Sequence, residues 1–343
     1  MKKKILLGFL FIALLFIAFN FQNIRYGIGQ ASGQIKVLSG AVPISEIKAD
    51  KNTPDSILQK IALIEEIRQF AIDSLGLNNS ENYTTFYDQK GKPILWVVTA
   101  SPEFKIEAHQ WCFPIAGCFP YKGYFNLEKA KQEEEKIKAK GLDTEIDEVS
   151  AWSTLGFFKD PILSSMLNKS EARLADLIIH ELTHATIYVK NNVSFNENLA
   201  NFAGKQGAIY FLKSKYGDSS EYVGEYNNSF KRKKLFSNYI REEIKELNSF
   251  YDSISNLKDL TKKRELKAKK IDEIKWGLLE VGYFKDSIKA AKRLKKFNPN
   301  NAYFSGFSTY SKKQNQLDSL FKTKYDSNLL KLIAGMKEQH GAK

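Results

Sequence analysis

Cysteine is scarce in this chain of 343 residues, which contains only Cys112 and Cys118. Two cysteines exclude a disulfide-rich scaffold, and their spacing is not that of a Cys-x-x-Cys redox or zinc pair. Each begins a Cys-Phe-Pro triplet, and the proline and glycine nearby supply a bend that brings the two sulfurs together. We therefore predict a disulfide in an oxidising compartment. Two free buried thiols, or a soft metal site with His109, are the alternatives.

Acidic side chains are outnumbered, with 39 Asp and Glu against 52 Lys and Arg and a formal net charge of +13. Most of the excess lies in lysine-rich stretches of the last third, where solvated helix faces are the simplest explanation. An anionic membrane surface is the next candidate. No nucleic-acid-binding motif accompanies the charge, so no nucleic-acid partner is predicted. A hydrophobic content of 43% is enough for a substantial core.

Long apolar runs are absent except at the N-terminus, where three lysines precede an uninterrupted run from Ile5 to Phe19. This pattern is typical of a Sec-type export segment. The run is short for a membrane span, and no small-x-small cleavage site follows it. We predict a signal anchor over residues 1–21, with a cleaved signal peptide or a buried soluble helix as alternatives. The body of the protein is then exported to the cell envelope, facing the periplasm or extracytoplasmic side, or released after cleavage.

Apolar residues at helical spacing predict a mainly helical chain. Helices are expected at 54–76, 127–140, 170–190, from about 194 onward, 230–292 and 314–338. Strands are expected at 93–100 and 121–125, and the first could align an extended peptide or simply belong to the core. The predicted fold class is mainly α with a small antiparallel β-sheet (α+β). Residues 22–343 are expected to form a single domain with a lysine-rich helical C-terminal part.

Histidine is also scarce, and two of the four histidines lie in the sequence His180-Glu-Leu-Thr-His184. Histidines four apart on a helix project from the same face, so both imidazoles can reach one divalent ion. The pattern is the HExxH motif of zinc peptidases, in which the glutamate, here Glu181, takes a proton from a metal-bound water. The preceding Leu-Ile-Ile indicates a buried turn, where two uncharged imidazoles and a carboxylate need a common cation. We predict one bound Zn²⁺.

A catalytic zinc ion needs a third protein ligand and an open position for water. Glu197 is the only acidic residue between Ala185 and Gly217, and it lies near the start of the next helix. Small residues later in that helix (Ala200, Ala203 and Gly204) would let it approach the HExxH helix closely. We predict that Glu197 is the third ligand. The alternative is a capping box with Ser194, in which the glutamate only satisfies a backbone amide. Asp176 could support His180, although an ordinary surface charge is the simpler role.

Four segments together resemble a family of bacterial zinc aminopeptidases, which are exported or lipid-anchored. They are Trp111–Cys118 with Tyr121–Tyr124, Ser153–Pro161, His180–His184 with Phe195–Glu197, and Asn300–Ala302 ahead of Tyr310. The likeness extends from Gly33 to residue 310 and implies a zincin-like fold with a His/His/Glu zinc site at His180, His184 and Glu197. Many members begin with a lipoprotein cysteine, which this chain lacks at its N-terminus.

These observations predict a zinc metallopeptidase, in particular an aminopeptidase acting on peptides, with Glu181 as general base. A second donor to the oxyanion is expected from Tyr188, Tyr210 or Tyr310, with Tyr310 preferred for its place in the family pattern. The first alternative is a non-catalytic, membrane-anchored envelope protein with a structural or vestigial metal site. The second is a binder of anionic polymers acting through the lysine-rich region 230–295.

Overall fold

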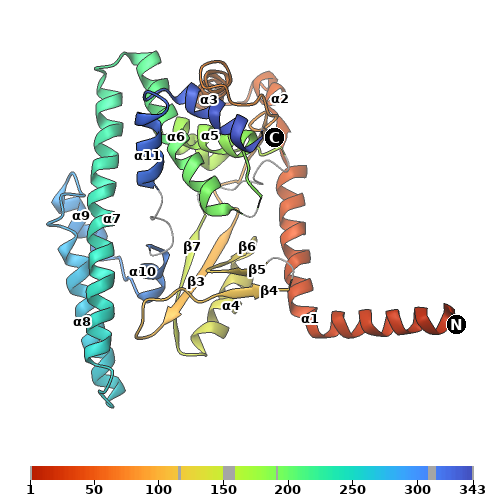
Figure 1. Cartoon of the computed structure of the whole chain (residues 1–343), viewed down its shortest axis with the longest axis vertical. Helices are drawn as coiled ribbons and strands as arrows, with labels where there is room; N and C mark the ends of the chain where they lie inside the picture. Colours follow the sequence, from red (N-terminus) through yellow and green to blue (C-terminus); the bar gives the residue numbers. More distant parts are fainter. Residues whose placement is uncertain (1, 115–116, 150–158, 191, 308–313, 342–343) are drawn as a thin grey trace.

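The computed structural model describes residues 2–114, 117–149, 159–190, 192–307 and 314–341, without the side chains of residues 2–19 and 314–316. It is mostly helical with small sheets, which confirms the predicted α+β class (Figure 1). The helices are α1 (Lys2–Ser39), α2 (Ile44–Ala49), α3 (Asp55–Asp73), α4 (Leu127–Lys138), the 3₁₀ helix η1 (Ser164–Asn168), α5 (Glu171–Thr186), α6 (Val193–Tyr216), α7 (Glu221–Ser253), α8 (Leu260–Gly277), α9 (Ser287–Leu294), α10 (Asn301–Phe307), α11 (Gln314–Thr323) and α12 (Leu329–His340).

The central sheet has the order β6-β3-β7 and is antiparallel throughout. Its strands are β3 (Trp96–Pro102), β6 (Lys122–Tyr124) and β7 (Leu142–Glu148). β3 begins three residues later than predicted, and β7 was not predicted at all. In β7, Thr144 is the buried residue among exposed or half-buried neighbours, so its apolar alternation is weak in the sequence.

The remaining strands form two further small sheets. β1 (Val42–Pro43) pairs with β2 (Thr85–Tyr87), which pairs in turn with β8 (Ile162–Leu163). The β2–β8 pair is parallel, whereas the pairs in the other two sheets are antiparallel. β4 (Trp111–Phe113) and β5 (Gly117–Phe119) form an antiparallel hairpin.

The largest hydrophobic core surrounds α5, which packs closely against α6 and α3. Three of its apolar side chains, Ile178, Ile179 and Leu182, are fully buried. They occupy the face of α5 that the hydrophobic spacing predicted to be internal. Burial on this side fixes α5 as a rigid platform for the side chains that project from it toward α6.

A second core joins α7 and α8 with α10 and the loop after β3. The helix predicted over 230–292 is three helices in the structure, and the first already begins at Glu221. Two N-caps explain the breaks, because the side chains of Asp259 and Asp286 accept backbone N–H bonds at the starts of α8 and α9. Figure 1 shows α7 and α8 side by side, extending along the central sheet.

Helix α1 bends, and its N-terminal part projects away from the rest of the molecule (Figure 1). Its later part is held to the sheet by Tyr26 and Gln30, which both donate to the carbonyl of Gly123. Across the residues that the structure describes, no helix is long and apolar enough to cross a membrane. The predicted signal anchor falls mainly on residues 1–19, whose side chains lie outside that description, so it stays a prediction.

Candidate metal centre

The metal centre begins with the two histidines of α5. Because they are four residues apart, His180 and His184 project from one face, and their Nε2 atoms lie 3.2 Å apart. The helix starts after Ser170, with Glu171 in its first turn, where a negative charge is favoured. It ends at Thr186, four residues earlier than predicted, so His184 lies in its last turn.

Glu197 reaches the same point from the second turn of α6. Its Oε1 lies 3.4 Å from Nε2 of His184, and its Oε2 lies 3.7 Å from Nε2 of His180. The helix is capped by Asn192, whose side chain accepts the N–H of Phe195. Ser194 therefore lies inside α6, which removes the capping-box geometry considered for Ser194 and Glu197.

Two features bring α6 close to α5. The side chain of Asn196 clamps the connecting turn by accepting the N–H of Val189 and donating to its carbonyl. Further along, Gly204 faces α5 so closely that a Cβ there would lie 2.6 Å from the carbonyl oxygen of Asp176 and 3.1 Å from Cβ of His180. Only glycine permits this approach, as the small residues in the sequence suggested.

The side chains of His184, His180 and Glu197 differ in their exposure to solvent. His184 is 2% exposed, His180 17% and Glu197 31%, so the cluster is closed on one side and open to solvent on the other. Burial, with a further contribution from His184, lowers the pKa of His180 to about 4. Burial alone would raise the pKa of Glu197, but its hydrogen bond to His184 and its electrostatic interactions with His184 and His180 lower it. His180 is therefore neutral and Glu197 ionised at neutral pH, which is the form that binds a metal.

Glu181 points into the same region. Its Oε1 lies 3.9 Å from Nε2 of His180, and the residue is buried. Burial, and then the charge of Glu181, raise the pKa of the Tyr83 hydroxyl. Glu181 lies beside the two imidazoles and not between them. From this position its carboxylate can exchange a proton with a group held by the two histidines and Glu197.

The donor set fits a tetrahedral cation. Zinc bonds nitrogen and carboxylate oxygen at about 2.0–2.2 Å, which places neighbouring ligand atoms roughly 3.3 Å apart in a tetrahedron. The separations of 3.2, 3.4 and 3.7 Å match this requirement closely. Two imidazole nitrogens this close also need a shared cation or proton between them. Glu181 also has a carboxylate oxygen within 4.8 Å of ligand atoms of both histidines, so a second carboxylate lies within reach of the same position.

Asn201 supports the centre and was not identified from the sequence. Its side chain hydrogen-bonds to His180, while the other ring nitrogen of His184, Nδ1, is buried with no hydrogen-bond partner among the described residues. A hydrogen-bond partner such as Asn201 fixes the ring orientation and tautomer of a metal-binding histidine. The signal was present in the spacing, because Asn201 follows Glu197 by four residues and so shares its helix face.

The other predicted site residues lie elsewhere or outside the described residues. Tyr310 falls in the segment 308–313, and part of the motif Ser153–Pro161 in the segment 150–158, neither of which the structure describes. Tyr210 donates its hydroxyl to the carbonyl of Ser327. Asp176 is not a free surface charge, since it lies 3.6 Å from Arg173 and burial raises its pKa. Tyr188 follows the end of α5.

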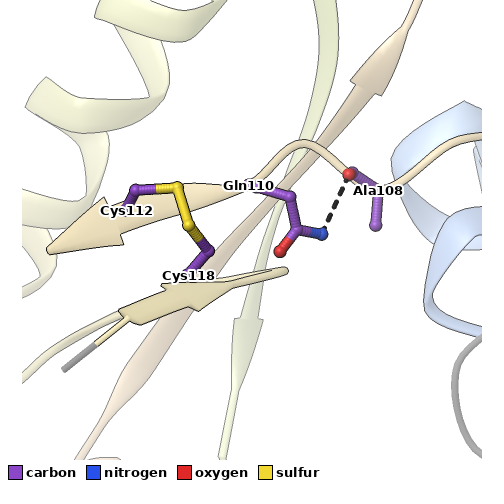
Figure 2. Close-up of a disulfide and its surroundings, with 4 residues drawn as sticks. All are labelled: Ala108, Gln110, Cys112 and Cys118. Carbon is purple, nitrogen blue, oxygen red and sulfur yellow. Dashed lines mark hydrogen bonds between the residues drawn. A yellow bond between two sulfur atoms is a disulfide. The ribbon is translucent and has the colours of Figure 1, made fainter.

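Cys112 and Cys118 are joined in a disulfide that crosslinks β4 and β5 (Figure 2). They are directly opposite one another in the hairpin register. Gln110, just before β4, donates its side-chain amide to the carbonyl of Ala108 (Figure 2). His109 stacks edge-on against Trp111 at 4.7 Å between ring centroids, so its ring packs rather than completing a soft metal site.

A helix pair that presents two histidines, a buried glutamate and a second carboxylate defines a class of candidate metallohydrolases. In a comparison with protein families, residues 25–340 match the family described as "Putative aminopeptidase". The chain belongs to this family, which makes a peptidase the supported class of enzyme. Neither a search of curated proteins nor one of solved structures finds a match.

Proposed function

We propose that this protein is a zinc-dependent peptidase, and in particular an aminopeptidase. The observation that carries the proposal is the convergence of His180, His184 and Glu197 within 3.2 to 3.7 Å, with Glu181 beside them. The family membership supports the peptidase part of the proposal. The zinc part rests on the donor chemistry, which is two imidazoles and one carboxylate with an open side.

In this proposal each residue of the site has a distinct role. His180, His184 and Glu197 hold the ion, and Asn201 fixes the ring of His180. The ion, when bound, makes a coordinated water acidic and polarises the peptide carbonyl. Glu181 accepts the proton from the attacking water and returns it to the nitrogen of the leaving amine. Tyr310 is proposed as the second donor to the developing oxyanion because of its place in the family pattern.

The proposed location is the cell envelope, with the N-terminal segment in the inner membrane and the peptidase on the extracytoplasmic side. The three lysines and the apolar run that follows support export. The disulfide between Cys112 and Cys118 fits an oxidising compartment. A peptide is the proposed substrate, and no nucleic-acid partner is proposed.

The direct test is Glu181→Gln. This variant should keep about one zinc ion per chain and lose peptide hydrolysis by at least roughly a hundredfold, because general-base catalysis contributes that much or more. Metal content and the rate of peptide hydrolysis are measured on the same samples. Glu171→Gln removes a carboxylate from the first turn of the same helix and should leave both unchanged. The proposal is falsified if Glu181→Gln retains full activity.

A second measurement separates the kinds of peptidase. A panel of peptides with free and blocked N-termini should show cleavage only of the free ones if the protein is an aminopeptidase. Cleavage of blocked peptides would keep the zinc peptidase but remove the exopeptidase label. A zinc-loaded wild-type protein that cleaves no peptide of either kind would instead support a non-catalytic metal site.

A further inference from the structure

A cavity of about 720 Å³ lies between the start of α5, the middle of α7 and the segment from Tyr283 to Arg293. Its volume is in the range of small-molecule binding sites. Six cationic side chains line it: Arg173, Arg232, Lys233, Lys285, Lys289 and Arg293. Asp286 is the one carboxylate among the described lining residues. The cavity is separate from the metal centre, because none of the proposed zinc ligands lines it.

Three of the six cations already have carboxylate partners. Lys285 pairs with Glu225 at 2.5 Å and Lys289 with Asp286 at 3.5 Å. Arg173 lies 3.6 Å from Asp176. The other three, Arg232, Lys233 and Arg293, form no ion pair within the described part of the chain. Three positive charges around one cavity repel one another, and a bound anion would relieve that repulsion.

Arg173 is the most constrained of these cations. Its Nη2 lies 3.3 Å from Oγ of Ser229. Its guanidinium lies over the rings of Tyr226 and Phe230, at 5.7 and 5.4 Å from their centroids. A guanidinium held in this way loses little freedom when it donates to an anion, and its flat fork suits phosphate and carboxylate oxygens.

The same cavity has an aromatic wall. Phe236, Tyr283, Phe284 and Phe307 all line it. The rings of Phe236 and Tyr283 lie 4.7 Å apart, and those of Tyr283 and Phe284 are also 4.7 Å apart. An inorganic ion would use only the cations, whereas a ligand with a flat apolar group would also use this wall.

We propose that this cavity binds an organic phosphomonoester whose other part is a flat, apolar group. A phosphomonoester carries between one and two negative charges at neutral pH and three acceptor oxygens, which suits several convergent cations. The proposed source is a free, soluble ester rather than a lipid headgroup. Figure 1 shows α7 and α9 on the side of the molecule opposite the projecting N-terminal part of α1, which is the part proposed to contact the membrane.

Titration calorimetry of the full-length protein tests the site, with phenyl phosphate and inorganic phosphate as probes. Phenyl phosphate should bind one molecule per chain and more tightly than inorganic phosphate. The double variant Arg232→Ala/Lys233→Ala should weaken its binding at least about tenfold, because two charge-assisted contacts are lost. Lys231→Ala/Lys234→Ala removes the same charge from the same helix outside the cavity and should change the affinity less than about twofold.

Two further arms decide between the possible outcomes. Tyr283→Ser should reduce the preference for phenyl phosphate over inorganic phosphate and leave the phosphate affinity unchanged. Equal weakening by the two double variants would show a general charge effect and overturn the site. Binding to phosphatidylcholine vesicles containing one-fifth phosphatidic acid, lost only in Arg232→Ala/Lys233→Ala, with no binding of phenyl phosphate, would overturn the soluble ligand in favour of a lipid. Circular dichroism checks that every variant is folded.

Discussion

At the scale of single residues, Glu197 decides whether the HExxH pair is a complete metal site. The two histidines follow from local helix geometry, but the third donor comes from another helix and depends on how the two helices pack. Its carboxylate lies 3.4 Å from His184 and is partly exposed, so it can bind an ion while leaving one side open. The neighbouring cap, Asn192, has a different and separable role.

We predict that Glu197→Ala loses the metal, because two imidazoles alone hold zinc weakly. Asn192→Ala is the matched variant, since it removes the true cap of α6 and should cost about 1 kcal/mol of stability with the metal retained. Metal-to-protein ratios and urea denaturation of both variants are the measurements. Unchanged metal content in Glu197→Ala, with only reduced stability, would return Glu197 to a structural role.

Glu145 on β7 gives a pH-dependent prediction. Burial, and then the charge of Asp147, raise its pKa to about 7 from 4.5. Between these values the folded protein keeps a proton that the unfolded chain releases, so this residue makes stability fall as the pH rises. Glu145→Gln should therefore be more stable than the wild type at about pH 8, with the difference shrinking as the pH falls toward about 4.5.

Urea denaturation across this pH range measures the effect of Glu145→Gln. The exposed Glu148 at the end of the same strand offers the matched control, Glu148→Gln. An identical pH profile for the wild type and Glu145→Gln would contradict the assignment of the raised pKa to Glu145.

At the scale of elements, the contact between α5 and α6 positions the metal donors. The contact depends on Gly204, whose missing side chain lets α6 approach the backbone of Asp176. The sequence showed the small residues but not which one faces α5. Gly207 also lies too close to α5 for a side chain, because a Cβ there would lie 2.8 Å from Cδ1 of Ile179.

Gly204→Ala should push α6 away from α5 and lower both zinc affinity and stability. The expected loss of stability is about 1–3 kcal/mol, the usual cost of overpacking against a fixed backbone. Gly224→Ala on α7 is the control, because a Cβ there meets nothing within 4 Å. It should stabilise its helix by roughly 0.5–1 kcal/mol. Zinc titration and thermal unfolding measure both variants, and an unaffected zinc affinity in Gly204→Ala would contradict the argument.

At the scale of the whole molecule, Asn301 connects the central sheet with the second core. It is fully buried, and its side-chain amide donates to the carbonyls of Pro102 and Glu103. Its side-chain oxygen accepts the hydroxyl of Tyr251 on α7, and its backbone N–H donates to Asp143 on β7. The Asn300–Ala302 motif therefore links the central sheet to the second core. That residues 22–343 form a single domain stays a prediction, and this link is part of what would hold such a domain together.

Asn301→Ala should cost at least about 3 kcal/mol, because several buried polar groups lose their partners at once. The wild type is expected to unfold in one transition, and this variant in two, with the α7–α8 core unfolding first and the metal retained until the second. Scanning calorimetry with metal analysis follows both steps. Asn298→Ala removes an exposed amide from the same loop and should behave as the wild type. A single, unshifted transition in Asn301→Ala would contradict this coupling.

The sequence by itself determined the features that depend on neighbours along the chain. These include the helical HExxH pair, most helix positions and the proximity of the two cysteines, because helix periodicity and short turns are local. Only the tertiary structure decided the approach of Glu197 and Asn201 to His180, the strand β7 and the cationic cavity. Each of these depends on residues far apart in the sequence, whose contacts arise from packing rather than from spacing. Tertiary packing therefore turned a motif into a site with a definite geometry.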